Sequence, residues 1–173
     1  LLTTPLDTRE TLQGDTVTRR MALDGKTLKH MPVTRQFLHS AKWRNLLNYV
    51  ASFKVQPIFY LQVIFSHVRK AKADPQTNLH SDTFHPSAKA WLFLEDVAAD
   101  EGPFVYVPGS HLLNPARLNW EQQKSEAITA KTDVMTRRGS FRVSESEILE
   151  LGYAKPQAFA VKANTLVIAD TYG

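Results

Sequence analysis

Two side chains that bind metal ions stand two positions apart in the middle of the chain, His80 and Asp82. On an extended strand, residues i and i+2 point to the same side, so an imidazole nitrogen and a carboxylate oxygen can converge on one ion. Such a pair provides two ligands of the triad of two histidines and one carboxylate, which holds Fe(II) and leaves coordination positions open. A His-x-Asp pair also occurs by chance, and its ordinary interpretation is a hydrogen-bonded pair on the surface.

Other histidines are candidates for a third ligand. His85 follows His80 by five residues, across a predicted turn that makes a shared metal awkward. His111 belongs to a Pro-Gly-Ser-His turn, where a hydrogen-bonding role is the simpler interpretation. The other three have no partner signal in the sequence and are interpreted as ordinary surface or helix residues: His30, His39 and His67.

Short apolar segments predict the strands that must position these residues. The segment 57–65 is rich in β-branched and aromatic residues and is the most strongly predicted strand. Further strands are predicted over 16–23, 89–94, 103–107, 158–161 and 165–169. The strands do not alternate regularly with helices, which favours an antiparallel sandwich or barrel over a parallel α/β sheet.

Three helices are predicted beside these strands. Apolar periodicity indicates a helix over 35–53 with Thr34 as its N-cap. The pair Asn114-Pro115 is typical of an N-cap followed by the first helical residue, and predicts a helix toward residue 128. Ser144 and Glu147 have the spacing of a capping box and predict a short helix that ends near Leu151.

The order of motifs after residue 78 resembles a known family. His80-x-Asp82 is followed by a strand that contains Ala90-Trp91, and then by a glycine-led segment, 102–111, that ends in Pro-Gly-Ser-His. This order resembles the phytanoyl-CoA dioxygenase family of Fe(II)- and 2-oxoglutarate-dependent oxygenases. The resemblance covers about residues 61–173, and its last part, 164–173, is similar to the strand that leads to the family's distal iron histidine.

The resemblance implies a mainly β fold, a double-stranded β-helix of the jelly-roll or cupin kind with flanking α-helices. We expect one domain over 1–173, with a flanking region at 1–56 and the jelly-roll core at 57–173. In the family, the distal histidine and the arginine that binds 2-oxoglutarate follow the last strand. Because neither residue is present and the chain lacks an initiator Met, we expect it to be incomplete at both ends; the alternative is a naturally truncated protein whose incomplete site cannot do the chemistry.

The resemblance also implies site residues. His80 and Asp82 would bind Fe(II), and Gln62 and Trp91 would contact the cosubstrate 2-oxoglutarate, with O2 as the second cosubstrate. Trp91 alternatively is a core aromatic residue, and Gln62 alternatively faces water. Lys89 lies on the same strand face as Trp91 and can meet a carboxylate, although an exposed lysine is the simpler interpretation. Related halogenases have a small residue in place of Asp82, so its carboxylate favours hydroxylation.

Composition excludes several other classes. The chain of 173 residues has no cysteine, which excludes disulfides, zinc–thiolate sites, iron–sulfur clusters and thiol nucleophiles. No apolar run reaches the roughly 18 residues of a membrane span. The densest basic run, 69–72, is too short to indicate nucleic-acid binding and is read as a solvated loop or as an attraction for an anionic substrate.

We therefore predict a cytoplasmic 2-oxoglutarate-dependent dioxygenase that hydroxylates a small-molecule substrate, with no nucleic-acid or membrane partner. Two alternatives use the same kind of barrel. One is a cupin-like module that binds a metal or ligand without turnover. The other is a metal-dependent isomerase or dioxygenase of the cupin type that needs no 2-oxoglutarate.

Overall fold

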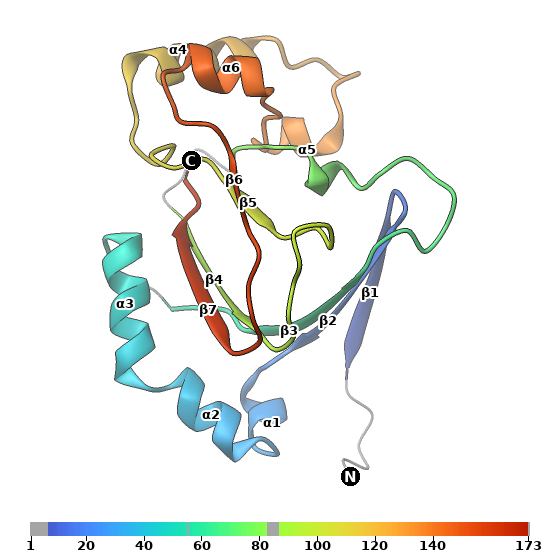
Figure 1. Ribbon diagram of the computed structural model, residues 1–173, viewed down its shortest axis with the longest axis vertical. Helices are drawn as coiled ribbons and strands as arrows, with labels where there is room; N and C mark the ends of the chain where they lie inside the picture. Colours follow the sequence, from blue (N-terminus) through green and yellow to red (C-terminus); the bar gives the residue numbers. More distant parts are fainter. Residues whose placement is uncertain (1–6, 55, 83–86, 173) are drawn as a thin grey trace. The chain divides into compact units, whose positions relative to one another are not determined.

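The computed structural model describes residues 7–54, 56–82 and 87–172 (Figure 1). The chain divides into two compact units, 1–77 and 78–173. The predicted strand over 57–65 belongs to the N-terminal unit, whereas the His80-x-Asp82 motif begins the C-terminal one. The organisation as a flanking region followed by a jelly-roll core stays a prediction.

The N-terminal unit contains a three-stranded antiparallel sheet in the order β1-β2-β3, whose strands are β1 Thr8–Gln13, β2 Thr16–Ala22 and β3 Tyr60–Phe65. Gly14 in the β1–β2 turn has a φ of +57°, and a Cβ there would lie 2.6 Å from the Lys72 carbonyl oxygen, so the turn requires glycine. The strand predictions over 16–23 and 57–65 are confirmed. Every residue of β3 is exposed, although the segment is apolar.

The helix predicted over 35–53 is wrong in its start and its continuity. The structure has two helices here, α2 Pro32–Leu38 and α3 Ala41–Ala51, after the short α1 Gly25–Leu28. Thr34 is not an N-cap, because Pro32 already occupies the first turn of α2. Ser40 has an extended backbone and separates the two helices, and the indole of Trp43 donates to the carbonyl oxygen of Phe37 over 2.8 Å.

The C-terminal unit contains two antiparallel strand pairs. Strand β4, Ala88–Phe93, pairs with β7, Thr165–Asp170, and β5, Phe104–Tyr106, pairs with β6, Gln157–Phe159. The rings of Trp91 on β4 and Phe104 on β5 have centroids 4.5 Å apart, and this contact joins the two pairs. The predicted strands over 89–94, 103–107, 158–161 and 165–169 are confirmed to within a few residues.

The C-terminal unit also contains three helices among its described residues, α4 Pro115–Glu126, α5 Val134–Arg137 and α6 Glu145–Glu150. Asn114 caps α4, and Ser144 with Glu147 forms the predicted capping box of α6, so both predictions are confirmed. Phe141 is only 1% exposed, and its ring meets Trp120 edge to face. This ring is the centre of the C-terminal core.

Across the residues described, six α-helices accompany seven strands, and all paired strands are antiparallel. The prediction of antiparallel pairing is confirmed, but the fold is mixed rather than mainly β, because 25–51 and 115–150 are largely helical. The strands form three separate small sheets, and the double-stranded β-helix stays a prediction. In the part of the chain that the structure describes, no helix is long and apolar enough to span a membrane.

The burial of Phe141 predicts a large loss of stability on truncation. Phe141→Ala should lower the free energy of unfolding by about 3–5 kcal/mol, since the ring is lost and a cavity remains. Chemical denaturation followed by circular dichroism measures this. Leu118→Ala is the matched control, because Leu118 is exposed on α4 and should cost less than about 0.5 kcal/mol. Equal losses in both variants would contradict the assignment of the core.

The capping box predicts a dependence of stability on pH. Burial of Glu147 alone would raise its pKa, but hydrogen bonds from Lys124, Trp120 and Ser144 outweigh this and lower the pKa to about 2. The ionised carboxylate therefore stabilises the fold above its ordinary pKa of 4.5, and this stabilisation is lost as the pH falls toward 2. Glu147→Gln should flatten the fall of unfolding free energy between pH 5 and pH 2, and Glu150→Gln on the exposed side of α6 should not.

Candidate metal centre

A short antiparallel contact positions the His-x-Asp motif. His80 forms a β-bridge with Arg142. On either side of the bridge, the Ser81 amide donates to the Phe141 carbonyl oxygen over 3.0 Å, and the Val143 amide donates to that of Leu79 over 3.1 Å. The backbone of 79–81 is therefore extended and is fixed to the segment 141–143, which begins with the buried Phe141. This is the backbone conformation that places His80 and Asp82 on one side, as the sequence predicts.

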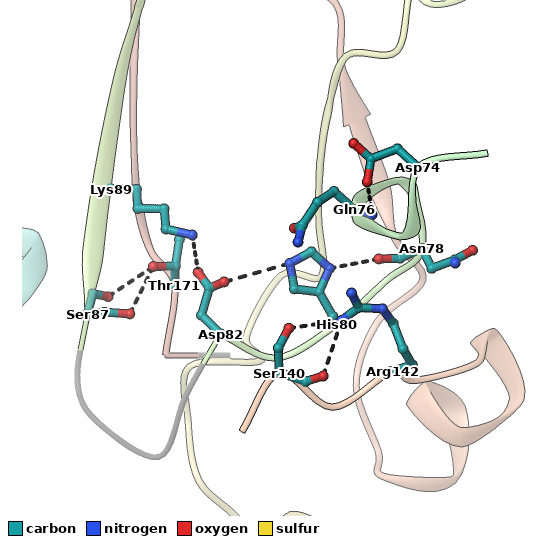
Figure 2. A network of polar contacts seen from close by, with 10 residues as sticks. All are labelled: Asp74, Gln76, Asn78, His80, Asp82, Ser87, Lys89, Ser140, Arg142 and Thr171. Atoms are coloured by element: carbon teal, nitrogen blue, oxygen red, sulfur yellow. Dashed lines mark hydrogen bonds and ion pairs between the residues drawn. The ribbon is translucent and has the colours of Figure 1, made fainter. Parts of the chain in front are cut away.

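Figure 2 shows that the two ring nitrogens of His80 have different partners, Asn78 on one side and Asp82 on the other. Its Nδ1 lies 2.7 Å from the carbonyl oxygen of Asn78. A carbonyl oxygen only accepts hydrogen bonds, so we assign the ring proton to Nδ1. In the neutral imidazole, Nε2 then presents a lone pair, which is the form in which histidine binds a metal. The carbonyl of Asn78 thus plays the orienting role that is usual behind metal-binding histidines.

The free nitrogen of His80 points at Asp82. His80 Nε2 and Asp82 Oδ1 are 3.7 Å apart, beyond hydrogen-bonding distance, and each side chain is 19% exposed (Figure 2). With the imidazole neutral, a nitrogen lone pair faces a carboxylate oxygen here, and a cation between the two atoms would satisfy both. An imidazole nitrogen and a carboxylate oxygen are ligands that Fe(II) accepts. The donor set therefore fits two positions of a metal centre.

No cluster of three or more metal-binding side chains occurs within the described ranges 7–54, 56–82 and 87–172. His85 lies outside the described residues. Nδ1 of His111 lies 3.4 Å from the Tyr106 hydroxyl, which fits the hydrogen-bonding role expected for a turn residue. The structure thus brings together the two predicted ligands, His80 and Asp82.

The second oxygen of Asp82 has a different partner. Lys89 Nζ lies 2.5 Å from Asp82 Oδ2 (Figure 2). Lys89 is on β4, and its side chain is 49% exposed. The structure shows both features that the sequence left open for Lys89, because its side chain is exposed and also contacts a carboxylate.

The two predicted cosubstrate residues lie in different units. Trp91 is half-buried on β4, in the same unit as His80, and packs on Phe104. Gln62 is on β3 in the N-terminal unit, where it is exposed and its Oε1 accepts a hydrogen bond from Arg20 Nε over 2.6 Å. Roles for Gln62 and Trp91 in binding 2-oxoglutarate stay predictions.

Arg142, opposite His80 in the bridge, was not anticipated from the sequence. Directly opposed residues of an antiparallel pair point to the same side, so the guanidinium lies on the side of His80. Its Nη1 donates to the carbonyl and hydroxyl oxygens of Ser140, whereas its buried Nη2 has no hydrogen-bond acceptor in the part of the chain that is described. A buried guanidinium nitrogen without an acceptor suits an anionic ligand.

Arg117, a buried arginine on α4, was also not predicted from the sequence. It forms an ion pair with Glu121 over 2.8 Å and donates to the carbonyl oxygens of Ser110 and Tyr172. It therefore fastens the Pro-Gly-Ser-His turn and the residues after β7 to one helix. The i,i+4 spacing of Arg117 and Glu121 was the available signal, but the same spacing is common on exposed helix faces.

A cavity of about 80 Å³ in the C-terminal unit reaches His80, and apolar side chains such as Val105, Val143 and Ile148 line much of it. Tyr106 also borders it and donates from its hydroxyl to the carbonyl oxygen of Asp170 over 2.8 Å. Burial raises the pKa of the Tyr106 phenol, and the nearby Asp170 carboxylate adds to the rise. The phenol is therefore a neutral hydrogen-bond donor at physiological pH.

The basic run 69–72 belongs to the N-terminal unit and is exposed. Arg69 Nε donates to the Gly14 carbonyl oxygen over 2.9 Å, so this cation helps to hold the loop. Both interpretations of the run, a solvated loop and an attraction for an anionic substrate, are compatible with this exposure.

Comparison with known proteins identifies the family. The sequence model of the phytanoyl-CoA dioxygenase family matches residues 5–145, which is most of the chain, and the chain belongs to this family. The match includes His80, Asp82, Trp91 and the Pro-Gly-Ser-His turn, and it extends to N-terminal residues in which the sequence showed no recognisable motif. Neither the curated proteins nor the solved structures contained a match to the chain.

The facing acceptors predict a metal site that depends on both side chains. His80→Ala and Asp82→Ala should each lower the Mn(II) affinity of the full-length protein by at least roughly 10-fold, since each removes a ligand rather than an orienting group. Isothermal titration calorimetry measures the affinity. His111→Ala is the matched control and should bind Mn(II) as the unaltered protein does. Unchanged binding in both ligand variants would show that the site is misassigned.

Proposed function

We propose that the protein is an Fe(II)- and 2-oxoglutarate-dependent dioxygenase that hydroxylates an unactivated C–H bond of a small molecule, with succinate and CO2 as co-products. The observation that carries the proposal is the pair of acceptors, His80 Nε2 and Asp82 Oδ1, which face each other across 3.7 Å in a chain of the phytanoyl-CoA dioxygenase family. Membership of the family supports this oxygenase class, and the contact of His80 with Asp82 supports the proposal that these two residues bind its metal.

Each residue of the proposed site has a physical task. His80 and Asp82 would hold Fe(II), and the Asn78 carbonyl would keep the imidazole in the tautomer that can bind it. Bound iron, together with 2-oxoglutarate, would supply the activation of O2 that side chains alone cannot provide. Trp91 and Gln62 would contact 2-oxoglutarate, with the half-buried indole helping to exclude water from the cosubstrate.

An anionic substrate is the more specific part of the proposal. The guanidinium of Arg142 on the side of His80 supports it, because its Nη2 has no acceptor among the described residues. A carboxylate or phosphate group would provide charged acceptors for that nitrogen. The cytoplasmic location stays a prediction from the sequence.

The proposed reaction predicts uncoupled turnover. The full-length protein with Fe(II) should slowly convert 2-oxoglutarate to succinate under air even without its substrate, because the cosubstrate would bind the iron whether or not the substrate is present. The measurement is succinate by mass spectrometry. An anaerobic sample and Asp82→Ala should both give no succinate above background. A folded, iron-loaded protein that forms none, alone and with a broad panel of small molecules, would instead support the non-catalytic cupin-like module.

A further inference from the structure

We infer that Lys89 is a positioning residue of the metal centre, which holds Asp82 so that only one carboxylate oxygen is available to the metal. The inference rests on the proposed function, because it concerns the same iron site. The observation is that the two oxygens of Asp82 have different partners, Lys89 at one and His80 at the other.

The two carboxylate oxygens of Asp82 have different neighbours and so can have different tasks. Oδ2 of Asp82 lies 2.5 Å from Lys89 Nζ, a close charge-assisted contact, whereas Oδ1 lies 3.7 Å from His80 Nε2 (Figure 2). A carboxylate that has one oxygen engaged by an ammonium group presents the other to a metal. Lys89 therefore fixes both the rotation of the carboxylate and the identity of its free oxygen.

A carboxylate with one available oxygen matters for the number of open positions on the metal. The proposed reaction needs three positions beyond those of the protein ligands, two for the 2-oxoglutarate chelate and one for O2. A carboxylate that binds through both oxygens would take one of these three. The ammonium group of Lys89 prevents this by occupying Oδ2.

The backbone makes Lys89 suited to this task. Lys89 lies opposite Ala169 in the β4–β7 ladder, and Ala169 is buried. Two residues before Lys89, the carbonyl oxygen of Ser87 accepts a hydrogen bond from the amide of the buried Thr171 over 2.8 Å. The stem of Lys89 thus starts from a fixed strand. Its ammonium group ties that strand to the segment that carries both candidate ligands.

Two simpler accounts of the pair predict different results. In the first, the ion pair is an ordinary surface contact, such as that of Lys162 Nζ with Asp96 Oδ2 at 2.6 Å, whose side chains are 86% and 56% exposed. Such exposed ion pairs contribute little to stability, and their removal should not change the affinity of a metal site. In the second, Lys89 competes with the metal for Asp82. Removal of Lys89 would then leave metal affinity unchanged in the first account and raise it in the second.

The experiment compares metal affinities in the full-length protein. Lys89→Met keeps the length of the side chain and removes its charge, Lys89→Arg restores a charged donor, and Lys162→Met removes the matched exposed pair. We expect Lys89→Met to bind Co(II) roughly 10- to 100-fold more weakly, as is usual when an orienting partner of a metal ligand is lost. Lys89→Arg should recover most of the affinity, and Lys162→Met should lose none.

A spectroscopic measurement separates positioning from a general loss of structure. The visible d–d spectrum of bound Co(II) reports its ligand set. In Lys89→Met, Asp82 can bind through both oxygens, so the spectrum of the saturated protein should change, whereas that of Lys89→Arg should match the unaltered protein. Lys89→Gln repeats the test with a polar, uncharged side chain should Lys89→Met fold poorly. Unchanged or tighter Co(II) binding by both uncharged variants, or an unchanged spectrum, would overturn the inference.

The outcome is distinguishable from failure of the proposed function. His80→Ala and Asp82→Ala are measured beside the lysine variants. Loss of Co(II) in both, with no change in Lys89→Met, would leave the metal centre in place and refute only the task of Lys89. Retention of Co(II) in both would refute the metal centre itself, and the inference about Lys89 with it.

Discussion

The antiparallel contact between residues 79–81 and 141–143 is the constraint on which the candidate metal centre depends. Its two backbone hydrogen bonds hold His80 extended, and one of them ends on the carbonyl of Phe141, the most buried large side chain of those described. The position of the ligand segment is therefore set by the packing of a core ring. A site built in this way is rigid, which a metal centre needs for its ligands to stay within bonding distance.

Hydrogen-bonding groups around the motif are arranged to leave one place unsatisfied. The carbonyl oxygen of Asn78 accepts a hydrogen bond from Nδ1 of His80, and the ammonium group of Lys89 contacts Oδ2 of Asp82. What remains is a nitrogen lone pair opposite a carboxylate oxygen. Most buried polar groups in folded proteins have hydrogen-bond partners. Two facing acceptors without such a partner break this rule, and exceptions of this kind are found at functional sites.

The sequence was most informative where a local rule decides the structure. The N-cap at Asn114, the capping box at Ser144 and the strands of β-branched residues follow from interactions within a few residues, and all are found. The His-x-Asp pair also follows from local geometry, since period-two alternation alone brings the two side chains to one side.

Tertiary contacts decided the rest and could not be predicted. The helix expected over 35–53 is broken at Ser40, where the indole of Trp43 satisfies carbonyls at the end of the first helix. The buried face of α3 consists of Trp43, Leu47 and Ala51, whereas the apolar Leu46 and Tyr49 are exposed. The partner of Lys89 likewise depends on where β4 lies beside the 79–82 segment, which no local pattern encodes.

The most direct test of the account is an anomalous diffraction map from crystals of the full-length protein grown with Mn(II) and 2-oxoglutarate. The account predicts one strong peak within bonding distance of both His80 Nε2 and Asp82 Oδ1, with Asp82 Oδ2 still on Lys89. A map with no peak between these two atoms at full Mn(II) saturation, or a peak on another set of residues, would contradict it.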